Sequence, residues 1–98
     1  MSFTQIMTVR TDDADRLQQL IASWHDEQHG SAPGYQGARL LEDREQPDRW
    51  LIEVDFSSRE EAERNNDRPE TESWAKGLRD LVRGEPEYHD YELSYTTS

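Results

Sequence analysis

The chain is predicted to fold as an α+β protein of the ferredoxin-like class, with the element order β-α-β-β-α-β. Three observations predict it. Segments with strand-type patterning lie near both ends of the chain and twice in the middle, two stretches with apolar residues at helical spacing separate them, and a proline interrupts the second helical stretch. This order gives a four-stranded antiparallel sheet with both helices packed on one face.

The first strand and the first helix follow from a change of period near residue 10. Residues 3–9 largely alternate, which predicts a strand with two faces: Phe3, Met7 and Val9 on one, and Thr4, Ile6 and Thr8 on the other. Apolar residues then recur at helical spacing: Leu17, Leu20, Ile21 and Trp24. Thr11 or Asp12 offers an N-cap, so we expect a helix over residues 13–28.

The middle of the chain predicts a β-hairpin. Gly30, Ser31, Ala32, Pro33 and Gly34 form a loop, after which residues 35–45 are expected to be extended. Pro47 suits the first central position of a turn. The next strand, residues 50–56, places four apolar side chains on one face: Trp50, Ile52, Val54 and Phe56.

The second helix is expected to be split. Ser58 and Glu61 form a capping box that opens it. Pro69 disfavours helical geometry at Arg68 but suits the first turn of a new helix. The helix then continues through an apolar stripe and is expected to close at Gly84 in a left-handed conformation. The stripe consists of Trp74, Leu78, Leu81 and Val82.

A last strand is expected over residues 88–96. Its alternation separates a mainly aromatic face from a polar face. The first consists of His89, Tyr91, Leu93 and Tyr95, and the second of Asp90, Glu92 and Ser94. We expect the aromatic face to lie toward the core, so that His89 and Tyr91 border any pocket between sheet and helices.

Composition excludes several classes of function. The net charge of −11 argues against nucleic acid and anionic membranes as partners, because phosphate contacts require clustered Lys and Arg. Cysteine is absent, and no apolar run approaches the roughly 20 residues that span a bilayer. We therefore expect a soluble cytoplasmic protein. A domain of 98 residues buries a modest fraction of its surface, which favours association with a second copy.

Several of these features together resemble a known family. The run from Pro33 to Ala38 before the second strand, the hairpin ending in Phe56 and the split helix over residues 60–74 are similar to the antibiotic biosynthesis monooxygenase (ABM) domain family. The resemblance implies one ABM-like ferredoxin-like domain over residues 1–98 and a homodimer whose sheets form a dimeric α+β barrel. It also implies a ligand pocket between sheet and helices, and a monooxygenase that needs no cofactor and oxidises a planar aromatic or quinol-like molecule.

The sequence departs from the family pattern after Pro69. Glu70 stands where many members carry a His. The haem-degrading members resemble this chain at Trp74, but strand one has Gln5 rather than Asn, and no His follows before Gly84. Two alternatives to the monooxygenase therefore remain: a non-catalytic ligand-binding or stress-associated dimer, and a haem-binding or haem-degrading protein.

The candidate site residues gather around the helix break. We expect catalytic roles for polar groups there and on the last strand: Asn65, Asn66, Glu70 and His89. We expect the substrate to contact apolar and aromatic side chains: Trp24, Trp74, Leu78 and Tyr91. The structural alternatives are that Asn65 and Asn66 serve turn formation and that Trp74 is a core aromatic whose indole N–H is satisfied locally.

Two further clusters of polar residues stand out in the sequence. His25 and His29 are four residues apart on the first helix, a spacing that suits a metal, but they fall at the edge of its apolar stripe or beyond it. We therefore predict that they face solvent and that the protein binds no metal. Two readings remain open for the charged residues around the hairpin and the last strands: ion pairs across strands or across a dimer, or a simply solvated charged face. These residues are Arg39, Arg44, Arg49, Glu53, Asp55, Asp90 and Glu92.

Overall fold

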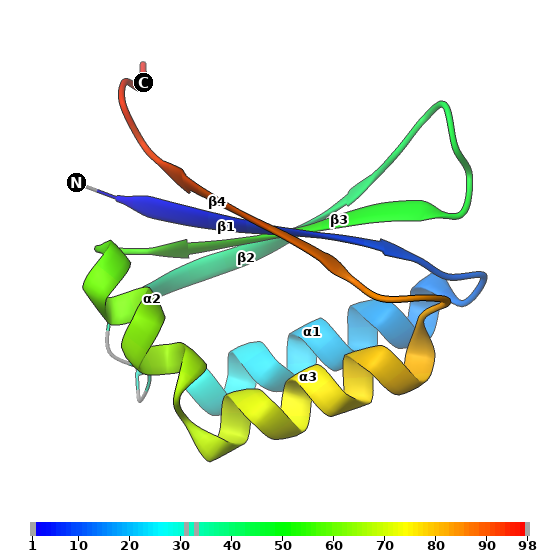
Figure 1. Ribbon diagram of the computed structural model, residues 1–98, viewed down its shortest axis with the longest axis horizontal. Helices are drawn as coiled ribbons and strands as arrows, with labels where there is room; N and C mark the ends of the chain where they lie inside the picture. Colours follow the sequence, from blue (N-terminus) through cyan, green and yellow to red (C-terminus); the bar gives the residue numbers. More distant parts are fainter. Residues whose placement is uncertain (1, 31, 33, 98) are drawn as a thin grey trace.

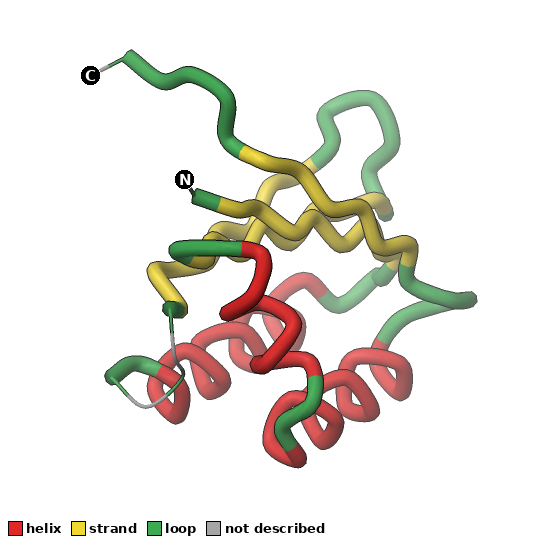
Figure 2. Tube along the Cα trace, turned by 60° about the vertical axis from the view of Figure 1, so that its left-hand side comes forward, coloured by secondary structure: helices red, strands yellow, loops and turns green. Residues whose placement is uncertain are grey.

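The structure is a computed structural model that describes residues 2–30, 32 and 34–97. Within these residues the elements are β1 (Phe3–Arg10), α1 (Ala14–Gln28), β2 (Tyr35–Glu42), β3 (Arg49–Phe56), α2 (Arg59–Asn66), α3 (Pro69–Leu81) and β4 (Glu87–Glu92). The strands form one antiparallel sheet in the order β2-β3-β1-β4. All three helices cover the same face of the sheet (Figures 1 and 2). The ferredoxin-like prediction is confirmed.

The core lies between the sheet and the helices, as the alternation of β1 and β3 predicts. Ile52 and Phe56 of β3 and Leu17 of α1 are almost completely buried. Residues at odd positions of β1 and even positions of β3 therefore face the helices, and the residues between them face away. We call the side of the sheet without helices the open face.

The boundaries of two strands differ from the predictions for local reasons. β2 ends at Glu42 because the side chain of Asp43 accepts hydrogen bonds from the N–H groups of Glu45 and Gln46, at 2.8 and 3.3 Å, which turns the chain. β4 ends at Glu92 because that residue already opposes Phe3, the first residue of its partner strand β1. The predicted extension of β4 to residue 96 is wrong.

Some helix termini agree more closely with the sequence, but the predicted closure at Gly84 is wrong: α3 ends at Leu81 with Val82 extended, and Gly84, with φ 69°, lies in the segment that follows. The N-cap of α1 is Asp13 rather than Thr11 or Asp12, and its carboxylate accepts a hydrogen bond from the N–H of Arg16 at 3.1 Å. Ser58 is confirmed as the N-cap of α2, because its hydroxyl accepts a hydrogen bond of 3.2 Å from the N–H of Glu61. The reciprocal half of the predicted capping box is not formed, since the Glu61 carboxylate pairs with Arg64 instead. Ser31 and Pro33, assigned to the loop before β2, lie outside the described residues.

The predicted break of the second helix is confirmed. Arg68 is extended, with φ −79° and ψ 139°, and Pro69 opens α3. The guanidinium of Arg68 donates a hydrogen bond to the side chain of Gln28, which is 1% exposed at the end of α1, and forms an ion pair of 2.8 Å with Glu70. The break is thus tied to α1, which fixes where α2 ends over the sheet.

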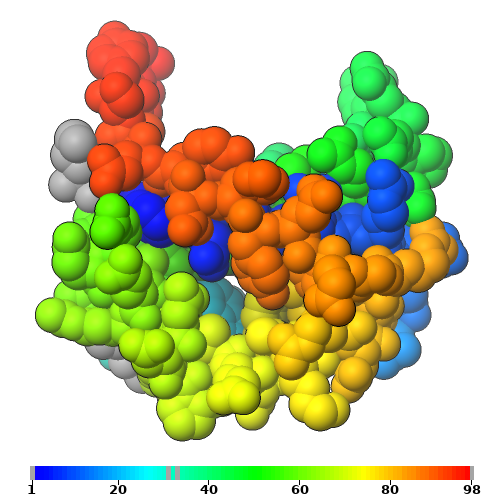
Figure 3. Space-filling view, in the orientation of Figure 1, coloured from blue at the N-terminus to red at the C-terminus, as the bar shows by residue number. Residues whose placement is uncertain are grey.

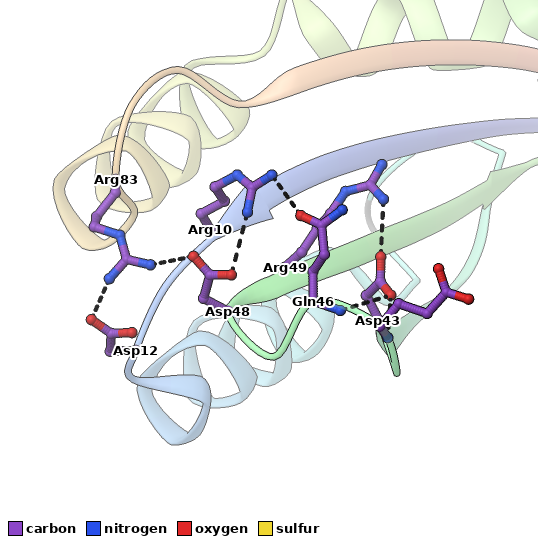
Figure 4. Close-up of polar contacts among 8 residues, drawn as sticks. Arg10, Asp12, Asp43, Gln46, Asp48, Arg49 and Arg83 are labelled. Carbon is purple, nitrogen blue, oxygen red and sulfur yellow. Dashed lines mark hydrogen bonds and ion pairs between the residues drawn. The ribbon is translucent and has the colours of Figure 1, made fainter.

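An ion-pair network holds the opposite end of the sheet (Figure 4). Arg83, after α3, bonds both Asp12 and Asp48, and Arg10 of β1 bonds Asp48 at 3.3 Å. Burial opposes ionisation of Asp48, but hydrogen bonds from Arg83 and from its own backbone, with the nearby charges, lower its pKa. The network joins the β2–β3 turn to β1 and to the segment leading into β4.

We searched the helices of the described part of the chain for a segment that could span a membrane and found none. None of these helices is both long enough and apolar enough to cross a bilayer.

Candidate functional site

A cavity of about 260 Å³ lies between the sheet and the helices, and we call it the pocket. Its sheet wall consists of Gln5, Met7, Ala38, Ile52, Val54, Phe56 and Tyr88. Its helix wall consists of Ile21, Trp24, Asn65, Asn66, Thr71, Glu72, Trp74 and Ala75. Most of these side chains are apolar, and the polar ones come mainly from the two sides of the helix break. This composition is typical of a small-molecule site.

Two tryptophans form the aromatic part of the helix wall. The ring centroids of Trp24 and Trp74 are 5.6 Å apart, and their planes are inclined by 44°. The indole N–H of Trp74 donates a hydrogen bond of 3.2 Å to the carbonyl of Leu20. Trp74 therefore fits the structural alternative, with a locally satisfied N–H, and also presents a ring to the pocket.

Three residues of the helix wall carry buried polar atoms with no hydrogen-bond partner among the described residues. These atoms are the indole Nε1 of Trp24, the amide Oδ1 of Asn65 and the hydroxyl Oγ1 of Thr71. Trp24 is 5% exposed and Asn65 3% exposed. A buried polar atom without a partner costs about 1–3 kcal/mol, so any molecule in the cavity that bonds these three atoms, whether ligand or water, would remove that cost.

The mouth of the pocket lies between α2 and β4. A second, more open hollow of about 410 Å³ shares Gln5 and Asn66 with the pocket, so it forms the outer part of the same cleft. Figure 3 views this side, where β1 (blue) is visible between α2 (green) and β4 (orange). Asn66 is exposed and lines the entrance, whereas Asn65 lies deep inside.

Glu70 lies outside the pocket. Its carboxylate is paired with Arg68, its side chain is 48% exposed, and it is absent from the pocket wall. The helical phase of α3 instead turns Thr71, Trp74 and Ala75 inward, with Glu72 beside them. The expected position of Glu70 at the pocket is therefore wrong, and Glu72 is the carboxylate that borders it.

His89 and Tyr91 belong to the open face by their register and are absent from the pocket wall, so the expectation that they border the pocket is wrong. Tyr91 does line the outer hollow at the mouth, whereas His89 lines neither. In the register of β1 and β4, His89 opposes Ile6 and Tyr91 opposes Thr4, and both of these β1 residues face away from the helices. Tyr88 opposes the buried Met7 and lines the pocket instead. Every residue of this edge strand is exposed, so hydrophobic burial does not mark its inner face.

Leu78 is fully buried in the core, at 0% exposure, and does not line the pocket. The expectation that it contacts the substrate is therefore wrong.

His25 is partly buried rather than solvent-facing, and its Nδ1 lies 2.6 Å from the hydroxyl of Tyr35. Burial and the charge of Asp55 raise the pKa of Tyr35. The ring centroid of the exposed His29 lies 5.2 Å from that of His25, and the two ring planes are inclined by 45°.

Among the other expected polar contacts, the cross-strand pair of Arg39 and Glu53 is confirmed at 2.5 Å on the open face. Thr4 donates a hydrogen bond of 2.7 Å to Asp55 on the same face. In the described part of the chain, no three His, Asp or Glu side chains are grouped so that they could hold a metal ion.

The sequence therefore located part of the wall. Asn65, Asn66, Trp24 and Trp74 are brought together. Among the wall residues that were not predicted, those with polar groups are Gln5, Thr71, Glu72 and Tyr88. Thr71 was detectable in principle, because it lies three residues before Trp74 on the same helix face. Gln5 was also detectable, as the one polar residue at an inward position of β1.

Solved structures of other proteins share the fold of this chain. The chain is similar over 97% of its length to 95% of the cofactor-independent oxygenase SnoaB from Streptomyces nogalater, with 17% identity and a TM-score of 0.80. It is similar over 96% of its length to 98% of a Bordetella bronchiseptica protein assigned to the antibiotic biosynthesis monooxygenases, with 15% identity and a TM-score of 0.81. A third similar structure is a Nitrosomonas europaea protein with the same assignment. The match covers 99% of this chain and 94% of the Nitrosomonas chain, with 19% identity and a TM-score of 0.77.

These structural similarities concern the fold. No curated protein sequence matches the chain significantly. The family model of the antibiotic biosynthesis monooxygenases matches residues 4–77, which include most of β1, the hairpin, the helix break and Trp74. The chain belongs to the antibiotic biosynthesis monooxygenase family.

Proposed function

We propose that this protein is a monooxygenase that uses no cofactor and oxidises a planar aromatic or quinol-like small molecule in the pocket. The observation that carries the proposal is the set of buried, unpartnered polar atoms of Trp24, Asn65 and Thr71 in an otherwise apolar cavity. Membership of the family and the likeness to SnoaB support the reaction type.

In this proposal the protein orients the substrate and stabilises charge. The ring lies against Trp24 and Trp74, the indole N–H of Trp24 donates to a substrate oxygen, and Asn65 accepts from a substrate hydroxyl. Glu72 takes a proton from the substrate, and the resulting carbanion reacts with molecular oxygen. When a ring CH₂ is oxidised to a carbonyl, one oxygen atom enters the product and the other leaves as water, so the substrate supplies all four electrons.

The experiment is oxygen uptake by purified protein, dialysed against a chelator, with a panel of anthrones and hydroquinones. We expect uptake above the uncatalysed rate for at least one substrate, and a lower rate in the Glu72→Gln variant because the proton acceptor is lost. If substrates bind but uptake stays at the background rate, the protein is a non-catalytic binding protein. Haem degradation has less support, because no His is among the described residues that line the pocket or its mouth.

We also propose a homodimer in which the open faces of two sheets pack together. In the described part of the chain no helix covers this face, and it carries partly buried or exposed apolar side chains, among them Ile6, Leu41, Leu51 and Tyr91. Burying such a face against a second copy would complete the small core. The family resemblance implies the same arrangement.

The dimer is tested by sedimentation velocity. We expect the wild-type protein to sediment with the mass of a dimer and the Leu51→Arg variant to shift to the monomer, because an unpaired guanidinium would be buried at the centre of the contact. The matched control is Ser23→Arg, which adds the same charge on the exposed surface of α1 and is expected to remain dimeric. A monomeric wild-type protein, or a dimeric Leu51→Arg variant, would contradict this arrangement.

A further inference from the structure

The charges around the mouth of the pocket limit which ligands can enter. Four charged side chains line the outer hollow: Arg59, Glu63, Asp90 and Glu92. Arg59 and Glu63 form an ion pair of 3.2 Å one helical turn apart on α2, so their charges largely cancel. Asp90 and Glu92 have no ion-pair partner among the residues that the structure describes. The mouth is therefore negatively charged.

The register of β4 produces this charge. Asp90 opposes Gln5 and Glu92 opposes Phe3, so both carboxylates lie on the helix-facing side of the sheet, beside the cleft. Gln5 donates a hydrogen bond of 3.2 Å to Asp90, which holds that carboxylate next to the residue shared by the pocket and its mouth. An amide donor leaves the negative charge of Asp90 in place.

The inner pocket offers no positive charge either. No Lys, Arg or His is among its described wall residues, and the one charged side chain there is Glu72, at the edge. The unpartnered groups deeper in the pocket are neutral: an indole N–H, an amide oxygen and a hydroxyl. A carboxylate buried there would lose its hydration without gaining a cation, which is strongly unfavourable.

We propose that the pocket selects uncharged ring compounds and rejects carboxylated ones, and that Asp90 and Glu92 at the mouth contribute to this selection. The inference rests on the proposed ligand pocket and narrows its substrate class. The ligand is then an uncharged aromatic molecule with at least one hydrogen-bond acceptor for Trp24 and one hydroxyl donor for Asn65. A neutral phenol or hydroquinone meets both requirements, whereas a quinone offers acceptors alone.

The test compares two probes of equal size, a hydroxynaphthamide and the hydroxynaphthoate with the same ring positions. Their dissociation constants are measured by isothermal titration calorimetry at neutral pH and low ionic strength. We expect the naphthoate to bind at least about tenfold more weakly than the naphthamide, because its carboxylate meets the mouth carboxylates and lacks a cation inside. In the Asp90→Asn/Glu92→Gln variant the ratio is expected to fall to about threefold, and in the wild-type protein added salt is expected to reduce it.

The matched control is the Asp15→Asn/Glu85→Gln variant, which removes the same two charges from exposed positions outside the pocket and its mouth. It should keep the wild-type ratio. Equal binding of both probes would overturn the selection but leave the pocket intact, whereas binding of neither would overturn both. The role of Asp90 and Glu92 would be ruled out by either of two results. One is that the ratio of the two dissociation constants is unchanged in Asp90→Asn/Glu92→Gln, and the other is that it falls equally in Asp15→Asn/Glu85→Gln.

Discussion

Replacing Asn65 with leucine is expected to lower kcat/KM for oxygen uptake by about 10²–10³-fold, the usual cost of losing one aligned polar group at a reacting centre. Asn65 is 3% exposed, lines the pocket and leaves its Oδ1 unpartnered, so its polarity serves no contact within the described protein. Leucine has nearly the same shape and cannot accept a hydrogen bond from the substrate.

The same substitution should not destabilise the fold. Removing a buried polar atom that has no partner eliminates its desolvation cost, so the melting temperature of Asn65→Leu is expected to equal or exceed that of the wild-type protein. Activity and stability would then change in opposite directions. This combination distinguishes a binding role from the turn-forming role, for which loss of Asn65 would lower stability and leave the rate unchanged.

Asn66→Leu is the internal comparison. Asn66 is adjacent in sequence but lies at the exposed mouth, so we expect its replacement to change kcat/KM by less than about tenfold. Oxygen uptake and thermal unfolding of both variants give the two readouts. A similar loss of activity in both variants would contradict the assignment of the deep position to Asn65.

The fold was predictable because its signals are local and consistent. The period of the apolar residues, the N-cap at Ser58 and the proline at position 69 each determine a short segment, and together they are consistent with one antiparallel arrangement. The site was predictable where a side chain belongs to an element with a clear apolar face, as Trp24 and Trp74 do. Both lie on the stripes that face the sheet.

The prediction failed where burial does not select a face. β4 is an exposed edge strand with aromatic residues at both odd and even positions. Its sequence is therefore compatible with either set of side chains facing the helices. Pairing of Met7 with Tyr88 determines the orientation, and a shift by one residue would exchange the two sets of side chains. His89 and Tyr91 were therefore assigned to the wrong side.

Glu70 was misplaced for a different reason. Its side chain forms an ion pair with Arg68, and Arg68 is itself held by Gln28 from α1, a contact between residues 40 positions apart. No local pattern in the sequence reveals that contact. It turns the first residues of α3 so that Thr71 and Glu72, rather than Glu70, reach the pocket.

Leu78→Ala is expected to lower the free energy of unfolding by about 2–5 kcal/mol, the range observed when a buried leucine is truncated and leaves a cavity. Leu78 is 0% exposed and packs in the cluster that joins α3 to the sheet. Since small domains are stable by about 5–15 kcal/mol, this is a large fraction of the total. Each kcal/mol corresponds to a fall of roughly 4–8 °C in Tm for a domain of this size.

The affinity of the folded Leu78→Ala protein for a neutral ring compound should remain within about threefold of the wild-type value, because a residue outside the wall makes no direct contact with the ligand. Leu81→Ala on the same helix is the control: Leu81 is partly exposed, so less apolar area and a smaller cavity are involved, and the stability loss should be smaller. Denaturant unfolding and calorimetric titration separate the two quantities. If Leu78→Ala weakens binding strongly while stability is retained, Leu78 contacts the ligand and the pocket extends deeper under α3 than its present wall. If stability falls and affinity holds, the buried stripe of α3 divides into a structural position at Leu78 and a ligand-facing position at Trp74, one helical turn apart.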